Sequence, residues 1–105
     1  MGTFTYNGTL TVEFEDRLLA HLQWVIMTKL RRNESFIFSW TKAEEAGGGR
    51  TSVWIDRHIP VVFDYPTSVV PEMSREWATG LMNTTFQVAG LQIIPDQVIA
   101  EAGTR

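Results

Sequence analysis

The chain has 105 residues, 20% of them charged and 44% hydrophobic, with nine Lys and Arg against twelve Asp and Glu and a net charge of −3. This length and composition predict one globular domain over residues 1–105 and exclude a disordered chain. The lack of cysteine excludes a disulfide scaffold, a Cys-based metal site and a thiol nucleophile, and the acidic balance disfavours a dedicated duplex-DNA binder.

The chain opens with a predicted hairpin and a predicted helix. Residues 3–6 and 9–14 alternate polar and apolar side chains, and Asn7-Gly8 between them tolerates the positive φ angles of a tight turn. Residues 17–32 contain no Gly or Pro and place their aliphatic side chains on one stripe at helical spacing. This pattern predicts an amphipathic helix, with His21 on its polar side.

A second hairpin is predicted in the middle of the chain. Residues 35–41 and 51–56 are rich in residues that favour strands. Between them, Gly47-Gly48-Gly49 is interpreted as the flexible tip of the hairpin.

The last part of the chain predicts smaller elements. A short strand over 61–63 is followed by a loop that Pro66 and Pro71 bracket, and a second helix is expected to begin at Pro71-Glu72. Residues 88–94 hold an optional last strand, and residues 101–105 are expected to fray. The second helix would carry on one face Met73, Trp77, Leu81 and Met82.

These elements predict an α+β fold. Their order is ββαβββα with an optional last strand, and the expected architecture is an antiparallel sheet of hairpins with two helices packed on it.

Catalytic and metal-binding patterns are scarce. The two histidines are His21 and His58, and Asp56 with His58 is the one conceivable acid–base dyad, a surface-loop histidine being the alternative. The sequence has no Gly-x-Ser-x-Gly elbow, no His-x-x-x-His pair and no phosphate loop of the required spacing. We therefore predict no catalytic residue, no metal ligand and no cofactor.

The central hairpin offers a possible aromatic surface. If Thr41 pairs with Thr51, one face collects four aromatic side chains, which are either core or an exposed platform. An exposed platform rimmed by arginines would bind single-stranded nucleic acid by stacking, whereas a register slip of one residue would remove it. The platform residues are Phe36, Phe38, Trp40 and Trp54. The residues predicted to contact a ligand or partner are Arg31, Arg32, Trp40, Arg50 and Trp54.

The first helix carries a second, unexpected stripe. Opposite its core side lie Ala20, Trp24, Met27 and Arg31, where a surface helix should be polar. Either another layer of the domain covers this stripe, or another chain does. Trp24 and Met27 are typical of an interface centre, so they are the predicted self-association residues.

Several segments together resemble a known protein family. They are Asp16–Ile26, Lys29–Arg32, Glu34–Trp40, Gly49–Trp54, Ile59-Pro60, Trp77 and Gly90-Leu91, together with the opening Met1-Gly2-Thr3. The chain is similar over nearly its whole length to small uncharacterised actinobacterial proteins, some of which carry the automated label "ATP-dependent DNA ligase". A ligase needs a Lys-x-Asp-Gly nucleophile and a second domain, which this sequence lacks, so the resemblance implies no catalytic residue here.

The sequence thus predicts a non-enzymatic binding domain that self-associates as a homo-oligomer, with a further protein partner possible. The alternative is an accessory module for nucleic acid. No stretch approaches the ~20 apolar residues of a membrane span, and no signal peptide is evident, so we expect a cytoplasmic protein without membrane contact.

Overall fold

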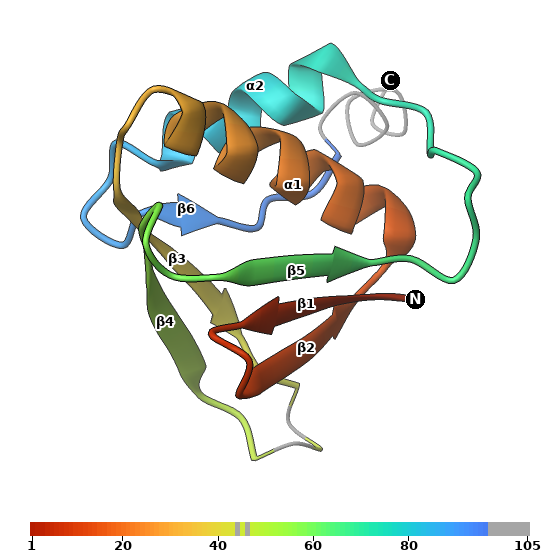
Figure 1. Ribbon diagram of the computed structural model, residues 1–105, viewed down its shortest axis with the longest axis horizontal. Helices are drawn as coiled ribbons and strands as arrows, with labels where there is room; N and C mark the ends of the chain where they lie inside the picture. The colour runs from red at the N-terminus through yellow and green to blue at the C-terminus, as the bar shows by residue number, and fades with distance from the viewer. Residues whose placement is uncertain (44, 46, 97–105) are drawn as a thin grey trace, which may run out of the picture.

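The computed structural model describes residues 1–43, 45 and 47–96. Within them the elements follow in the order β1(Gly2–Tyr6), β2(Leu10–Phe14), α1(Asp16–Arg31), β3(Phe36–Thr41), β4(Arg50–Ile55), β5(Val61–Asp64), α2(Arg75–Thr84) and β6(Leu91–Gln92) (Figure 1). The predicted α+β class and element order are confirmed, including the short last strand. The expected fraying of residues 101–105 lies outside the described residues.

The strands form two three-stranded sheets instead of the single sheet expected. One sheet has the order β2-β1-β5 and is antiparallel, whereas the other has the order β4-β3-β6, with β6 parallel to β3. Each hairpin has one apolar face, and two sheets bury both of these faces by turning them toward each other.

Aromatic side chains fill the space between the two sheets. Phe4 of β1 contacts Phe38 and Trp40 of β3, with ring centroids 5.7 and 6.4 Å apart. Phe14 of β2 approaches the same two rings. The hairpin aromatics therefore form the core, and it is the first sheet that covers them, not α2.

The expected register of the central hairpin is wrong by one residue. Thr41 pairs with Arg50 instead of Thr51, and Ile37 pairs with Trp54. Paired residues share a face, so Trp54 lies on the outer face of β4 while Phe38 and Trp40 lie inside. The connection between the two strands is too long to dictate the pairing, so burial of the aromatic face decides the register.

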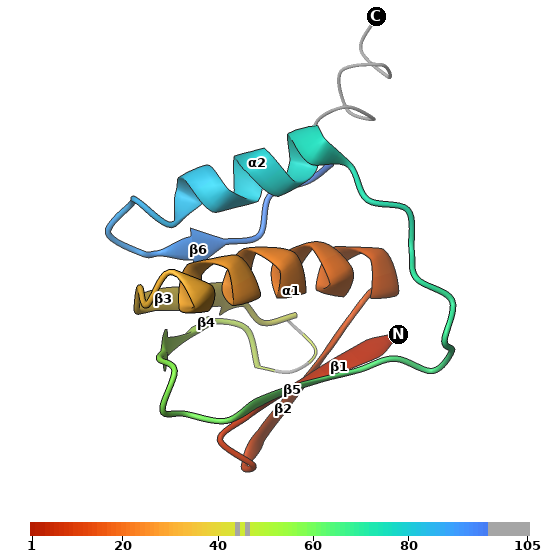
Figure 2. The same cartoon turned by 45° about the horizontal axis from the view of Figure 1, so that its top comes forward.

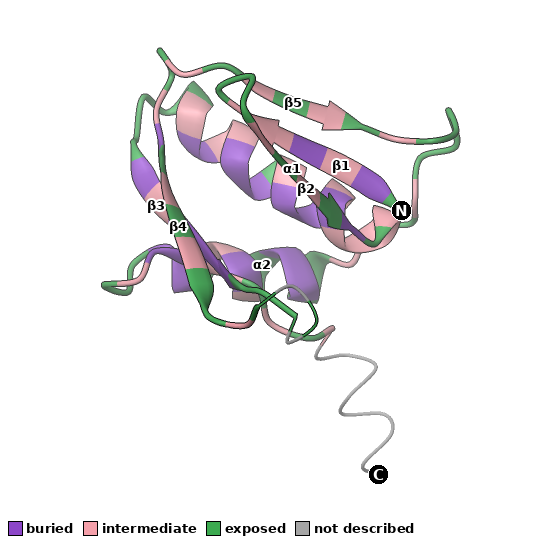
Figure 3. Ribbon diagram, turned by 90° about the horizontal axis from the view of Figure 1, so that it is seen from below, coloured by how far each residue is buried: buried purple, intermediate pink, exposed green. Residues whose placement is uncertain are grey.

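The two helices lie on one side of the sheets. The aliphatic stripe of α1 is fully buried at Leu19, Leu22, Val25 and Ile26, as the purple faces in Figure 3 show. Helix α2 runs alongside α1 (Figure 2) and buries Trp77 and Leu81. In the described part of the chain, no helix has both the length and the apolar character that crossing a membrane requires.

Helix α2 begins later than the sequence predicts. Its first residue is Arg75, and the Ser74 hydroxyl caps it by accepting from the Trp77 N–H at 3.2 Å. Pro71 and Glu72 precede the helix, because a serine cap satisfies the first free N–H groups better than Pro71 does. Residues 65–73 are therefore left as a connection that loops from β5 to α2 around the N-terminal end of α1 (Figure 1).

Candidate binding groove

The exposed stripe of α1 forms one wall of an open groove. Ala20, Trp24, Met27 and Arg31 all line a cavity of about 520 Å³. Trp24 remains 45% exposed, so no layer of the described chain covers this stripe fully. The sequence indicated these residues because their spacing gives an apolar face opposite the core.

The other wall is the connection of residues 65–73, which we call the strap. It lines the groove with Tyr65, with the polar side chains of Thr67 and Ser68, and with Val69, Val70, Pro71 and Met73. Val69 and Val70 are 77% and 78% exposed, and Met73 is 42% exposed. The two prolines predict a loop here but not its role as a wall of the groove, for which the adjacent valines Val69 and Val70 are the signal in the sequence.

Hydrogen bonds fix the strap to the first half of α1. The Tyr65 hydroxyl donates to Gln23 Oε1 at 2.7 Å, and Arg17 Nε donates to the Glu72 carbonyl at 3.0 Å. Burial, and secondarily the negative charge of Asp16, raises the pKa of Tyr65 to about 12. The phenol therefore stays neutral, and remains a donor to Gln23, well above physiological pH.

His21 is hydrogen-bonded to Ser74, the residue that follows the strap. The sequence placed His21 on the polar side of the helix, and this prediction is wrong. His21 is fully buried. Its Nε2 accepts the Ser74 N–H at 2.8 Å, which leaves Nδ1 as the donor to the Arg17 carbonyl at 2.7 Å. The ring lies against Trp77 with centroids 4.5 Å apart. Helix α2 and the strap cover the side of α1 that the sequence assigned to solvent.

The groove offers few side chains that could take part in acid–base chemistry. Its lining contains no Asp, Glu or His, and its single charged residue is Arg31. Apolar and aromatic side chains make up most of the strap wall and half of the α1 wall, with Gln23, Thr28 and the strap hydroxyls as hydrogen-bonding groups. Across the described residues, no group of three His, Asp or Glu side chains could hold a metal ion.

The five predicted ligand-contact residues are not brought together. Arg31 lies in the groove, while Trp40 and Arg50 line a separate cavity of about 240 Å³ beside β6. Trp40 is only 7% exposed, whereas Trp54 is 51% exposed on the outer face of β4. Arg32 is exposed just beyond the end of α1. Of the two alternatives that the sequence left open for these aromatics, core or exposed platform, Phe36, Phe38 and Trp40 belong to the core.

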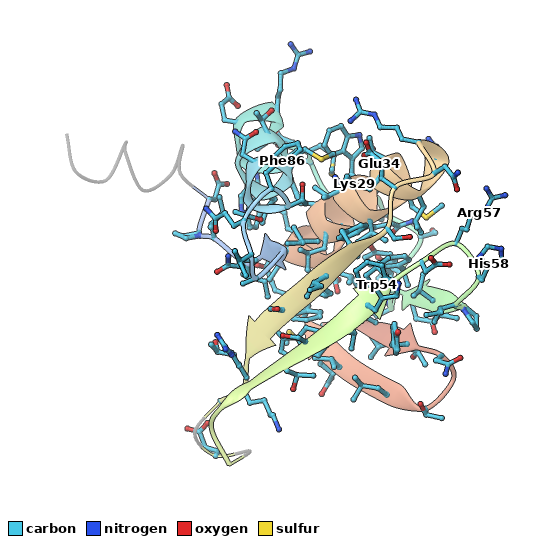
Figure 4. All side chains as sticks on the ribbon, turned by 90° about the vertical axis from the view of Figure 1, so that its left-hand side faces the viewer. Lys29, Glu34, Trp54, Arg57, His58 and Phe86 are labelled. Atoms are coloured by element: carbon cyan, nitrogen blue, oxygen red, sulfur yellow. The ribbon has the colours of Figure 1, made fainter. Side chains whose placement is uncertain are left out.

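The three basic residues near the end of α1, Lys29, Arg31 and Arg32, differ in their exposure to solvent. Lys29 is buried, with its Nζ 3.3 Å from Glu34 Oε1 and 5.0 Å from the centre of the exposed Phe86 ring (Figure 4). Its charge is thus satisfied inside the domain. Arg31 and Arg32 remain exposed.

Asp56 and His58 do contact each other, in the turn after β4. The Asp56 carboxylate accepts the His58 N–H and faces its Nδ1, both at 2.9 Å, and accepts the Ser35 hydroxyl at 2.7 Å. These bonds, the His58 backbone bond first, lower the pKa of Asp56 to about 2. Among the described residues, no hydroxyl is hydrogen-bonded to His58, which points into solvent beside Arg57 (Figure 4). The arrangement is that of an Asx turn, in which the Asp56 carboxylate accepts the N–H of the residue two positions later.

Comparison with family models gives a match over residues 1–96 to the family described as domain of unknown function DUF7882. The chain belongs to this family. The DUF7882 region includes α1, the strap and every residue that lines the groove. No curated protein and no solved structure matches the chain.

Proposed function

We propose that this DUF7882 domain acts by binding a protein at the α1 groove, and that its first partner is a second copy of itself. The observation that supports this most is the exposure of apolar side chains on both walls. Trp24 on α1 and Val69 and Val70 on the strap are all more than two-fifths exposed. A cluster of exposed apolar groups of this kind is typical of an interaction surface.

A protein partner fits the groove better than a small ligand does. The cavity is large enough for a small molecule, but Val69 and Val70, which line it, are more than three-quarters exposed, and much of their surface would stay in water around such a ligand. A second protein surface would cover these valines and the groove together. Aromatic and methionine side chains such as Trp24 and Met27 are enriched where interfaces are fully buried.

The mass of the protein in solution tests this function. We expect the average mass, measured by light scattering after gel filtration, to rise with protein concentration. Trp24→Gln should hold the protein at the monomer mass over the same range. Trp54→Gln is the matched control, because Trp54 is exposed to a similar extent as Trp24 but lies on β4. A wild-type mass that stays monomeric at every concentration would contradict the proposal.

A nucleic-acid role is the second candidate, and one observation favours it. Trp54 is half-exposed three residues from the solvent-facing Arg57, whose Nη1 donates to Asn33 Oδ1 at 2.8 Å (Figure 4). One base could stack on Trp54 with its phosphate near Arg57. Titration with a short single-stranded oligonucleotide should then quench tryptophan fluorescence at low salt, less at high salt, and not in Trp54→Gln. Equal quenching in Trp54→Gln would exclude this surface.

A further inference from the structure

Two exposed charges of opposite sign lie near opposite ends of the groove. Arg31 is in the last turn of α1 and lines the groove, while Glu72 belongs to the strap. Both residues are exposed. In the described part of the chain, neither side chain forms an ion pair.

Arg31 and Glu72 cannot meet within one copy. The Glu72 carbonyl accepts from Arg17 Nε at 3.0 Å, so Glu72 lies beside the first turn of α1. Arg17 and Arg31 are separated along the helix by about 21 Å at the α-helical rise. The hydrogen bonds that hold the strap thus lie on the first half of α1, at Arg17 and Gln23, and the exposed stripe ends at Arg31, which has no ion-pair partner among the described residues.

A two-fold arrangement would bring these charges together. If two α1 helices pack antiparallel through their exposed stripes, the first turn of each helix lies beside the last turn of the other. Position 24 lies midway between positions 17 and 31, so the two-fold axis passes near Trp24. Each strap then covers the Met27 half of the other copy's stripe, and the partner's Glu72 lies near Arg31.

We propose that two copies associate in this way: α1 packs antiparallel on α1, the exposed Val69 and Val70 of each strap contact the Met27 face of the other copy, and Arg31 pairs with the partner's Glu72. The contact is self-complementary, as a two-fold interface must be. This inference rests on the proposed self-association and adds its geometry. The charge pairs lie at the rim, where they fix orientation more than they add affinity.

Charge reversal tests the geometry. Arg31→Glu and Glu72→Arg should each weaken association roughly three- to thirtyfold at low salt, because either variant places like charges together twice in each dimer. The double variant Arg31→Glu/Glu72→Arg should restore the wild-type association constant to within about threefold. The measurement is sedimentation equilibrium at low and high salt, and high salt should shrink the differences.

Arg32→Glu is the matched control, because Arg32 neighbours Arg31 in the chain but does not line the groove. It should associate as the wild type does. If the protein associates through Trp24 but the double variant fails to recover, or if Arg32→Glu weakens association as much as Arg31→Glu does, the antiparallel geometry is wrong and the proposed function stands. If the wild type is a monomer throughout, both fall.

Discussion

At the scale of single residues, His21 is the side chain whose role depends most on its surroundings. Its two ring nitrogens connect the Arg17 carbonyl of α1 to the Ser74 N–H at the start of α2. Both bonds require the neutral ring with its proton on Nδ1. One buried imidazole thus positions the end of the strap and, with it, one wall of the groove.

Replacing His21 tests this role. We expect His21→Leu to lower the free energy of unfolding by about 1–3 kcal/mol, because the part-buried Ser74 N–H loses its acceptor while the side-chain volume is nearly kept. His58→Leu is the control and should change stability by less than about 0.5 kcal/mol, since His58 is exposed. Urea denaturation measures both. A His21→Leu protein as stable as the wild type would show that water replaces the lost bond.

Asp56 predicts a pH dependence at the turn after β4. Its pKa falls from 3.8 in the unfolded chain to about 2 in the folded one. The carboxylate therefore contributes stability above about pH 4, and this contribution disappears as the pH falls through 2. We expect the stability advantage of the wild type over Asp56→Asn to shrink across that window. A constant difference from pH 6 to pH 2 would mean that the charge has no part in it.

At the scale of elements, the parallel pairing of β6 with β3 depends on one glycine. Gly90 has a φ of +74°, and a Cβ there would lie 2.0 Å from the Ile37 carbonyl oxygen. The chain can return beside β3 only because this position lacks a side chain. The sequence could suggest a last strand but not its direction, because only two residues form it.

Gly90→Ala should therefore destabilise the domain by more than about 2 kcal/mol, from the clash with backbone together with the positive φ. Gly8→Ala is a matched control, because Gly8 has a φ of +71° but nothing within 4 Å of the added Cβ. It should cost about 1 kcal/mol. Thermal unfolding of the two variants separates the steric contribution from the conformational one, and equal losses would show that the close approach to Ile37 relaxes freely.

At the scale of the whole molecule, the fold buries its core and leaves an apolar surface on one side. Two sheets and α1 enclose the aromatic centre, and α2 covers the His21 side of α1. With these layers placed, the strap is the one segment among residues 1–43, 45 and 47–96 that is left to cover the Trp24 stripe. It lies alongside the stripe without closing over it, which is why a groove forms there.

Self-association at that groove predicts a concentration-dependent melting temperature. Because only folded copies would associate, the melting temperature of the wild type should rise with protein concentration. Trp24→Gln should melt at one temperature throughout. Calorimetry across a hundredfold range of concentration measures this, and a wild type whose melting temperature does not change would argue against association of the folded state.

The sequence by itself determined the elements, because their signals are local. The Asn7-Gly8 turn, the 3.6-residue period of α1 and the β-formers of 36–41 each specify a backbone state within a few residues. The same periodicity located the Trp24 stripe. The family resemblance adds to this, since its segments run through the region that the DUF7882 model matches.

Only the tertiary structure decided which faces are covered. The hairpin register, the burial of His21 and Trp40, and the exposure of Trp54 all depend on contacts between segments far apart in the chain. The sequence pattern of a strand is compatible with either register, and the register is decided only when another layer buries one face. For the same reason the strap could not be recognised from sequence: its valines form a wall only because the Tyr65 and Arg17 hydrogen bonds hold it beside α1.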